Sequence, residues 1–221
     1  MQINLFRETW TLLKKEAVLE WRTKNSIQAI LIYALSTVFV CYWALHTTEP
    51  PVWNALFWVI MVFSSINAAA KSFMQENQAR QLYLFTMASP QAMFISKLIF
   101  SSVIMVVLTL CSIFLYSLLL GFPVIYPDKY LLCLVMGALN LSAIFTLLSA
   151  IASRAGNNMT LLSILGLPLV LPVIFILIRF SASTLMGSVL MYGSRDLIAL
   201  AMLYIIIVGT SLLVFPYIWR D

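Results

Sequence analysis

Residues 98–120 read LIFSSVIMVVLTLCSIFLYSLLL, and this stretch contains no Asp, Glu, Lys or Arg. A transmembrane α-helix needs about 20 predominantly apolar residues, because the hydrocarbon core of a bilayer is about 30 Å thick. The stretch is therefore long enough to cross a membrane as a helix. It also lacks the alternation of apolar and polar residues that is typical of strands in membrane barrels.

Five further stretches have the same character. The six predicted spans are residues 26–45, 52–70, 98–120, 130–152, 161–178 and 197–215. Hydrophobic residues make up 62% of the chain and charged residues 10%, whereas soluble domains are about 45–50% apolar and about 25% charged. We therefore predict an all-α integral membrane protein with six transmembrane helices, forming one transmembrane domain over residues 1–221.

The net charge of +5 does not indicate nucleic-acid binding, because the positive residues lie in the connections between spans rather than in one patch. Cytoplasmic segments of membrane proteins carry an excess of Lys and Arg. If the N-terminus is cytoplasmic, only Lys129, Arg179 and Arg195 of the 13 Lys and Arg residues fall outside. This asymmetry predicts that both termini lie in the cytoplasm.

Residues 1–25 predict an amphipathic helix. The apolar residues that recur at steps of three and four are Ile3, Phe6, Trp10, Leu13, Ala17 and Trp21, and the opposite face carries Glu8, Lys15 and Arg22. Such a helix lies in the membrane interface. It either anchors the chain or also contacts a cytoplasmic partner.

The connection after the second span, residues 71–97, is the longest on the predicted cytoplasmic side and reads KSFMQENQARQLYLFTMASPQAMFISK. Its centre is polar and consists of good helix formers, and Ser89-Pro90 predicts a break with a helix beginning at Pro90 or just beyond. We interpret the segment as a coupling segment that docks on a cytoplasmic protein; an ordinary polar loop is the alternative. The predicted contact residues are Gln75, Glu76, Asn77, Arg80 and Gln81.

Two further residues are weaker candidates. His46, the only histidine, lies in a tight outer connection and is either a solvated residue or a ligand of haem or a metal. Asn140 lies in the fourth span beside small residues, where it either packs helix against helix or contacts a substrate.

Several irregular features fall near the later spans. Pro168 and Pro172 predict a kink or break in the fifth span. Residues 180–195 are too short and polar to span, and we expect a short outer-face helix or a re-entrant piece there. Lys97, Arg179 and Asp196 flank the predicted spans, and we expect them to reach the headgroups.

Catalytic motifs are absent from the sequence. No GxxxxGK[ST], HExxH or GxSxG pattern occurs, so the chain cannot hydrolyse ATP alone, and we expect no catalytic residues and no metal site. The cores of the predicted spans carry no charged residue, which argues against a proton-coupled transporter. Any energy for transport must then come from a separate ATPase on the cytoplasmic face.

The order of an interfacial helix, six spans and a long cytoplasmic segment after the second span resembles the membrane subunits of ABC-2 type transporters. More specifically, the chain is similar to the CcmB family, the haem exporter B subunits of the cytochrome c maturation system. The residues that carry this resemblance are Phe73, Glu76, Arg80, Gln81-Leu82, Ala88-Ser89-Pro90 and Ser96-Lys97.

The resemblance implies a non-catalytic permease subunit in the bacterial inner membrane, present as a homodimer and driven by a separate ATPase, the A subunit, which binds ATP. It also implies C and D membrane subunits, a haem chaperone (E), and haem as cargo of the complex. In that family, ATP serves to release the haem-loaded chaperone. The alternatives are an ABC-2 permease for a lipid, glycan or drug, a non-transporting assembly scaffold, and, with least support, a membrane enzyme.

Overall fold

The computed structural model describes residues 5–23, 25–44, 49–72, 89–154, 159–187 and 189–220. All regular structure within these ranges is helical. The helices are α1 (Leu5–Thr23), α2 (Asn25–Ala44), α3 (Pro50–Ser72), α5 (Pro90–Leu120), α6 (Pro127–Arg154), α7 (Met159–Met186) and α8 (Val189–Arg220). The prediction of an all-α protein with an N-terminal helix ahead of six long helices is confirmed.

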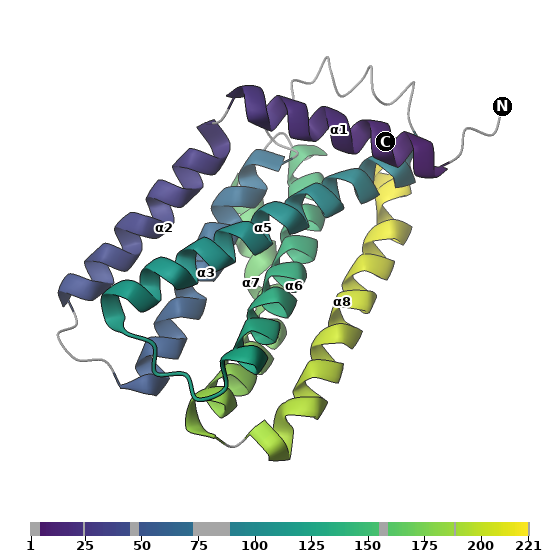
Figure 1. Ribbon diagram of the computed structural model, residues 1–221. Helices are drawn as coiled ribbons and strands as arrows, with labels where there is room; N and C mark the ends of the chain where they lie inside the picture. Colours follow the sequence, from purple (N-terminus) through teal and green to yellow (C-terminus); the bar gives the residue numbers. More distant parts are fainter. Residues whose placement is uncertain are drawn as a thin grey trace.

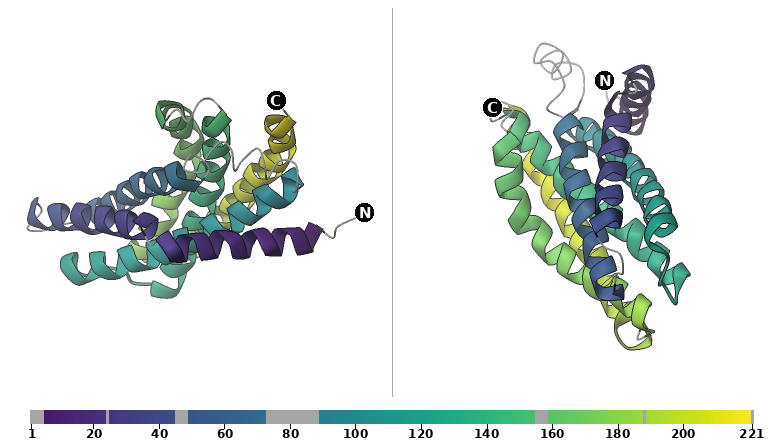
Figure 2. Two further views of the ribbon diagram at one scale, coloured as in Figure 1. Left: turned by 90° about the horizontal axis from the view of Figure 1, so that it is seen from above. Right: turned by 90° about the vertical axis from the view of Figure 1, so that its left-hand side faces the viewer.

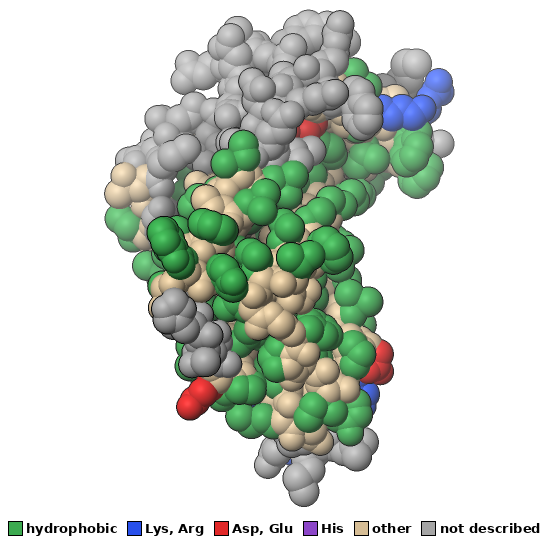
Figure 3. Space-filling view, turned by 60° about the vertical axis from the view of Figure 1, so that its left-hand side comes forward, with side chains coloured by type: hydrophobic (Ala, Val, Ile, Leu, Met, Phe, Trp, Pro, Cys, Tyr) green, Lys and Arg blue, Asp and Glu red, His purple; other side chains and the backbone are tan. Residues whose placement is uncertain are grey.

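Five of the described helices, α3, α5, α6, α7 and α8, are long and apolar enough to cross a membrane. The remaining predicted span corresponds to α2, which has 20 residues and is therefore about 30 Å long. On the face shown in Figure 3, hydrophobic side chains cover the middle of the molecule, and the charged side chains of the described residues lie toward its ends. This distribution suits a bilayer, in which charge is tolerated near the headgroups.

Helix α6 packs against α3, α5, α7 and α8, and its candidate span is the most buried of the five. In its candidate span 67% of the residues are buried inside the protein, compared with 11% for α8. Figure 1 shows α1 across one end of the other helices, and the view from above in Figure 2 shows it beside the first part of α5. The first part of α5, which belongs to the predicted coupling segment, is thus packed against the N-terminal helix α1.

A close approach of three helices lies inside the bundle at Gly137 of α6. A β-carbon at this position would lie 2.5 Å from the ring of Trp58 on α3 and 3.2 Å from Leu177 on α7. The Trp58 indole also donates a 2.9 Å hydrogen bond to the Ser181 hydroxyl on α7. Glycine is required here because it alone leaves room for the indole.

The helices extend further than the predicted spans, and this corrects the placement of two charged residues. Lys97 is 2% exposed and Asp196 is 3% exposed, so the prediction that they reach the headgroups is wrong for both. Each lies within a helix, Lys97 in α5 and Asp196 in α8, and each pairs with an opposite charge. The side chain of Arg179 is 53% exposed, although it too lies within a helix.

Two expectations about the later spans are also corrected. Residues 180–186 continue α7 and residues 189–195 begin α8, so no separate outer helix or re-entrant piece lies among them. The two helices meet at Gly187, whose φ of 77° ends α7. Of the predicted kink or break at Pro168 and Pro172, the break is wrong: both prolines lie on the exposed face of α7, and one helix runs through them. Each proline removes only one backbone donor, so the rest of the hydrogen-bond ladder can continue.

Candidate functional site

The predicted contact residues of the coupling segment, Gln75, Glu76, Asn77, Arg80 and Gln81, lie outside the described residues, and so does His46. Of the coupling segment, the structure describes the two ends, residues 71–72 and 89–97. Residues 73–88 are followed directly by Ser89 and α5, and α1 lies against the start of α5. We therefore build the site from the junction of α1 and α5.

The first contact of this junction is at the N-terminus of α5. Ser89 occupies the N-cap position with an extended backbone, and Pro90 begins the helix, which confirms the predicted start. The Ser89 hydroxyl donates a 2.6 Å hydrogen bond to a carboxylate oxygen of Glu8 on α1, and the Ser89 amide donates a longer one, 3.4 Å, to the same oxygen. A carboxylate is stabilising at this place, because a helix N-terminus carries a partial positive charge.

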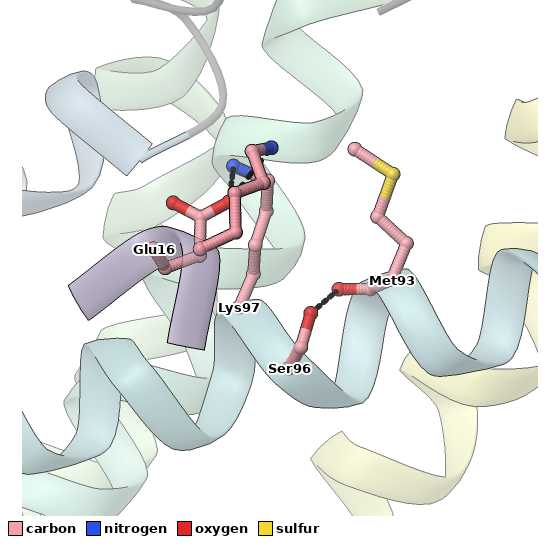
Figure 4. Close-up of polar contacts among 5 residues, drawn as sticks. Glu16, Met93, Ser96 and Lys97 are labelled. Carbon is pink, nitrogen blue, oxygen red and sulfur yellow. Dashed lines mark hydrogen bonds and ion pairs between the residues drawn. The ribbon is translucent and has the colours of Figure 1, made fainter. Parts of the chain in front are cut away.

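The second contact lies about two turns further along both helices. The Lys97 ammonium is 3.4 Å from a carboxylate oxygen of Glu16 on α1, and the ammonium of Lys15 is 3.3 Å from the same oxygen. Figure 4 shows Glu16 and Lys97 pointing toward one another between the two helices, with Ser96 bonded to the Met93 carbonyl beside them. The polar face of α1 therefore turns toward α5.

An apolar cluster includes residues of α5 that are close to Lys97 in the chain. Met93, Phe94 and Leu98 of α5 form a buried cluster with Phe215 near the end of α8, and Leu12 of α1 packs against it. The rings of Phe94 and Phe215 lie 5.1 Å apart. Because an unpaired charge in such surroundings is costly, the carboxylate of Glu16 stabilises the position of Lys97.

Asn140 of α6 is fully buried and joins two helices. Its amide nitrogen donates to the Leu200 carbonyl on α8 at 3.3 Å and to the Met136 carbonyl of its own helix at 2.9 Å. Two residues further on, Ser142 shares a 3.0 Å hydrogen bond with Ser102 of α5. The amide nitrogen of Asn140 thus packs α6 against α8, whereas its amide oxygen is buried without a hydrogen-bond partner among the described residues.

Replacing Asn140 by Ala is therefore expected to lower stability modestly, by about 0.6 kcal/mol and at most about 2 kcal/mol, the range measured for hydrogen bonds between membrane helices. The check is the thermal midpoint of the purified protein in one fixed detergent, with Thr210→Ala as the control, because Thr210 is exposed and bonds only within its own helix. An unchanged midpoint together with altered haem handling would instead assign Asn140 to the substrate.

Another charged pair links α7 and α8. The Arg179 guanidinium donates two hydrogen bonds to the Asp196 carboxylate, of 3.2 Å from Nε and 2.5 Å from Nη2. Sequence reasoning placed both residues near span ends but did not pair them. Their opposite charges in consecutive helices were the available signal.

Metal-ligating side chains do not gather in the part of the chain that the structure describes, where no group of three His, Cys, Asp or Glu residues could hold an ion. The three cysteines, Cys41, Cys111 and Cys133, are free thiols. Cys133 lies in the main hydrophobic core, so its surroundings are those of a packing residue.

The chain matches a protein-family model over most of its length. The family model described as CcmB protein matches residues 7–218, which run from α1 to the last turn of α8 and include both contacts of the α1–α5 junction. A search of the curated proteins found no match.

Proposed function

Because the chain belongs to the CcmB family, the membrane component of a haem-export ABC system, we propose that a separate ATPase drives it during cytochrome c maturation. The observation that carries the proposal is the match over residues 7–218. The absence of any ATP-binding motif from the sequence supports the assignment of ATP hydrolysis to another subunit.

The proposed docking site for the ATPase is the coupling segment, residues 71–97, with Gln75, Glu76, Asn77, Arg80 and Gln81 as contacts. Its end is anchored, because Ser89 and Lys97 are held by α1. A displacement of the segment would therefore act on α5 at once, since residues 90–97 of the segment form the first turns of α5.

In the proposed complex, a homodimer of this subunit works with the A-subunit ATPase, the C and D membrane subunits and the haem chaperone E. ATP use serves release of the haem-loaded chaperone, and haem is cargo rather than a resident cofactor. The distribution of Lys and Arg supports cytoplasmic termini and an inner-membrane location. His46 would then lie on the outer side, where it is the proposed contact for haem, because imidazole is a common iron ligand.

The test is purification of the tagged full-length protein in mild detergent, with identification of the proteins that accompany it and an absorption spectrum. The proposal expects an ATPase, the C and D subunits, and a Soret band from haem in the complex. An ATPase without cytochrome c maturation proteins would indicate another cargo. A preparation without any ATPase would favour an assembly scaffold and contradict the proposal.

Charge reversal in the coupling segment, Glu76→Lys or Arg80→Glu, is expected to lower the yield of holocytochrome c about tenfold, because coupling energies between sites are typically about 1–3 kcal/mol. The subunit should still insert and ATP should still be hydrolysed. The measurements are haem staining of cytochrome c in membranes and ATPase activity of the purified complex. The matched control is Lys129→Glu, a charge reversal in the first turn of α6 on the predicted outer side. Normal cytochrome yield in both segment variants would contradict the docking assignment.

A further inference from the structure

We propose that α1 and the first turns of α5 move as one rigid body during the transport cycle, with Glu16 and Lys97 as the positioning residues that hold them together. This inference rests on the proposed function, because it concerns how a push from the ATPase is transmitted. It is carried by the two contacts between these helices, and it gives α1 a role beyond membrane anchoring.

The register of α1 and α5 supports their movement as one body. Glu8 and Glu16 are eight residues apart on α1, and their partners Ser89 and Lys97 are also eight residues apart along the chain. Both pairs run in the same direction, so α1 and α5 lie alongside each other for about 12 Å, the rise of eight helical residues. A slip of one helix past the other by one turn, about 5.4 Å, would break both contacts at once.

The burial of the Glu16–Lys97 pair also supports movement of the two helices as one body. An exposed ion pair contributes little, because water screens both charges and the side chains lose freedom. Lys97 is 2% exposed, and the side chain of Glu16 is 16% exposed. Separating α1 from α5 would move Glu16 away from a buried ammonium beside the Met93, Phe94 and Leu98 cluster. Removal of one partner of a buried pair is strongly destabilising.

The outward face of α1 differs in its chemistry from the face that contacts α5. Leu5, Phe6, Trp10 and Val18 are exposed, and the Lys14 ammonium lies 5.5 Å from the centre of the Trp10 ring. This apolar and basic surface suits the headgroup boundary of a membrane, whereas Glu8 and Glu16 are directed at α5. The membrane-facing contacts of α1 are therefore separate from its contacts with α5, so α1 can slide along the interface while it remains fixed to α5.

The test uses charge exchange in the full complex. Glu16→Lys and Lys97→Glu are each expected to lower the holocytochrome yield about tenfold, while ATP hydrolysis per complex stays within about twofold of the unchanged protein. The exchanged double variant, E16K/K97E, should recover at least about half of the yield. Thr11→Lys, a charge change at an exposed residue of the same helix whose hydroxyl bonds within that helix, is the control and should be near normal. Normal yield in both single variants, or no recovery in the exchanged variant, would overturn the inference.

A second measurement separates movement from folding. In a background with Cys41, Cys111 and Cys133 changed to Ser, Glu8→Cys and Ser89→Cys place two thiols on facing positions of α1 and the start of α5. A cysteine side chain is shorter than that of Glu8, so a short bis-methanethiosulfonate reagent bridges the two thiols through disulfides that a reductant cleaves. The oxidised, cross-linked complex in nanodiscs is expected to contain the bridge and to release the haem-loaded chaperone with ATP as fast as the reduced complex. Failure of the cross-link to form, or release that stops on oxidation and returns with reductant, would overturn the inference.

The two proposals fail in different ways. Release that does not depend on ATP in the unmodified complex would count against the proposed function, and with it against the transmission of a push. The cross-link reports the contact of α1 with α5 by itself, and the comparison of oxidised with reduced complex reports whether that contact must open.

Discussion

Replacing Gly137 by Ala is expected to lower the free energy of unfolding by about 2–3 kcal/mol, the upper part of the range for overpacked cores. The added carbon would lie 2.5 Å and 2.7 Å from two ring atoms of Trp58. Ordinary contacts between carbon atoms are about 3.5–4.0 Å. The indole cannot retreat easily, because it is buried among α3, α6 and α7 and its nitrogen is bonded to Ser181. The larger Gly137→Val should prevent folding.

The measurement is thermal unfolding of the detergent-purified protein, followed by the loss of its monodisperse peak in size-exclusion chromatography. Gly209→Ala is the matched control: Gly209 also lies in a spanning helix, but a β-carbon there meets nothing within 4 Å. Its midpoint should not fall, because Ala favours a helix more than Gly does. Adding Trp58→Phe to Gly137→Ala should recover part of the loss, since the smaller ring relieves the overlap. Equal midpoints for Gly137→Ala and Gly209→Ala would contradict the argument.

The long apolar helices that the structure describes could be predicted from the sequence, because each apolar stretch is long enough to span a bilayer. The helix ends could not be predicted from the same signal. Charged residues were taken as boundaries, so the third span was predicted to begin after Lys97, although α5 begins at Pro90. Local turn chemistry was more accurate there, because Ser89-Pro90 correctly indicated the start of the helix.

The candidate site was only partly predictable. The length and polarity of the connection singled out residues 71–97, but the partners of Ser89 and Lys97 lie on α1, about 80 positions earlier in the chain. Helical periodicity separated Glu8 from the apolar face of the first helix, yet no local pattern says whether a polar face meets water or another helix. The pairing of Glu16 with Lys97 depends on tertiary packing. The same is true of the contact between Trp58 and Gly137, which places an indole over a glycine of another helix.

The two residues of the Arg179–Asp196 pair are expected to differ in the stability that is lost when each is replaced. Arg179→Leu is expected to lower the free energy of unfolding by about 3–5 kcal/mol, because it leaves the carboxylate of Asp196, which is 3% exposed, without its two hydrogen bonds from the guanidinium. Asp196→Asn should cost only about 1 kcal/mol. The amide oxygen can still accept a hydrogen bond, and the Arg179 side chain is 53% exposed, so its charge can be solvated near the headgroups.

Thermal unfolding of the purified variants measures this difference. Arg195→Leu is the control: Arg195 is the exposed neighbour of Asp196, and its replacement removes the same charge. Replacing both partners, R179L/D196L, should recover much of the stability lost in Arg179→Leu, since an apolar pair leaves no buried charge. Equal losses of stability in Arg179→Leu and Asp196→Asn would contradict the argument that the burial of Asp196 makes the two replacements differ. The mutual attraction of the two charges would then account for both losses. If the double variant were no better than Arg179→Leu, the loss would come from packing of the long arginine stem, because its aliphatic part covers apolar surface as well.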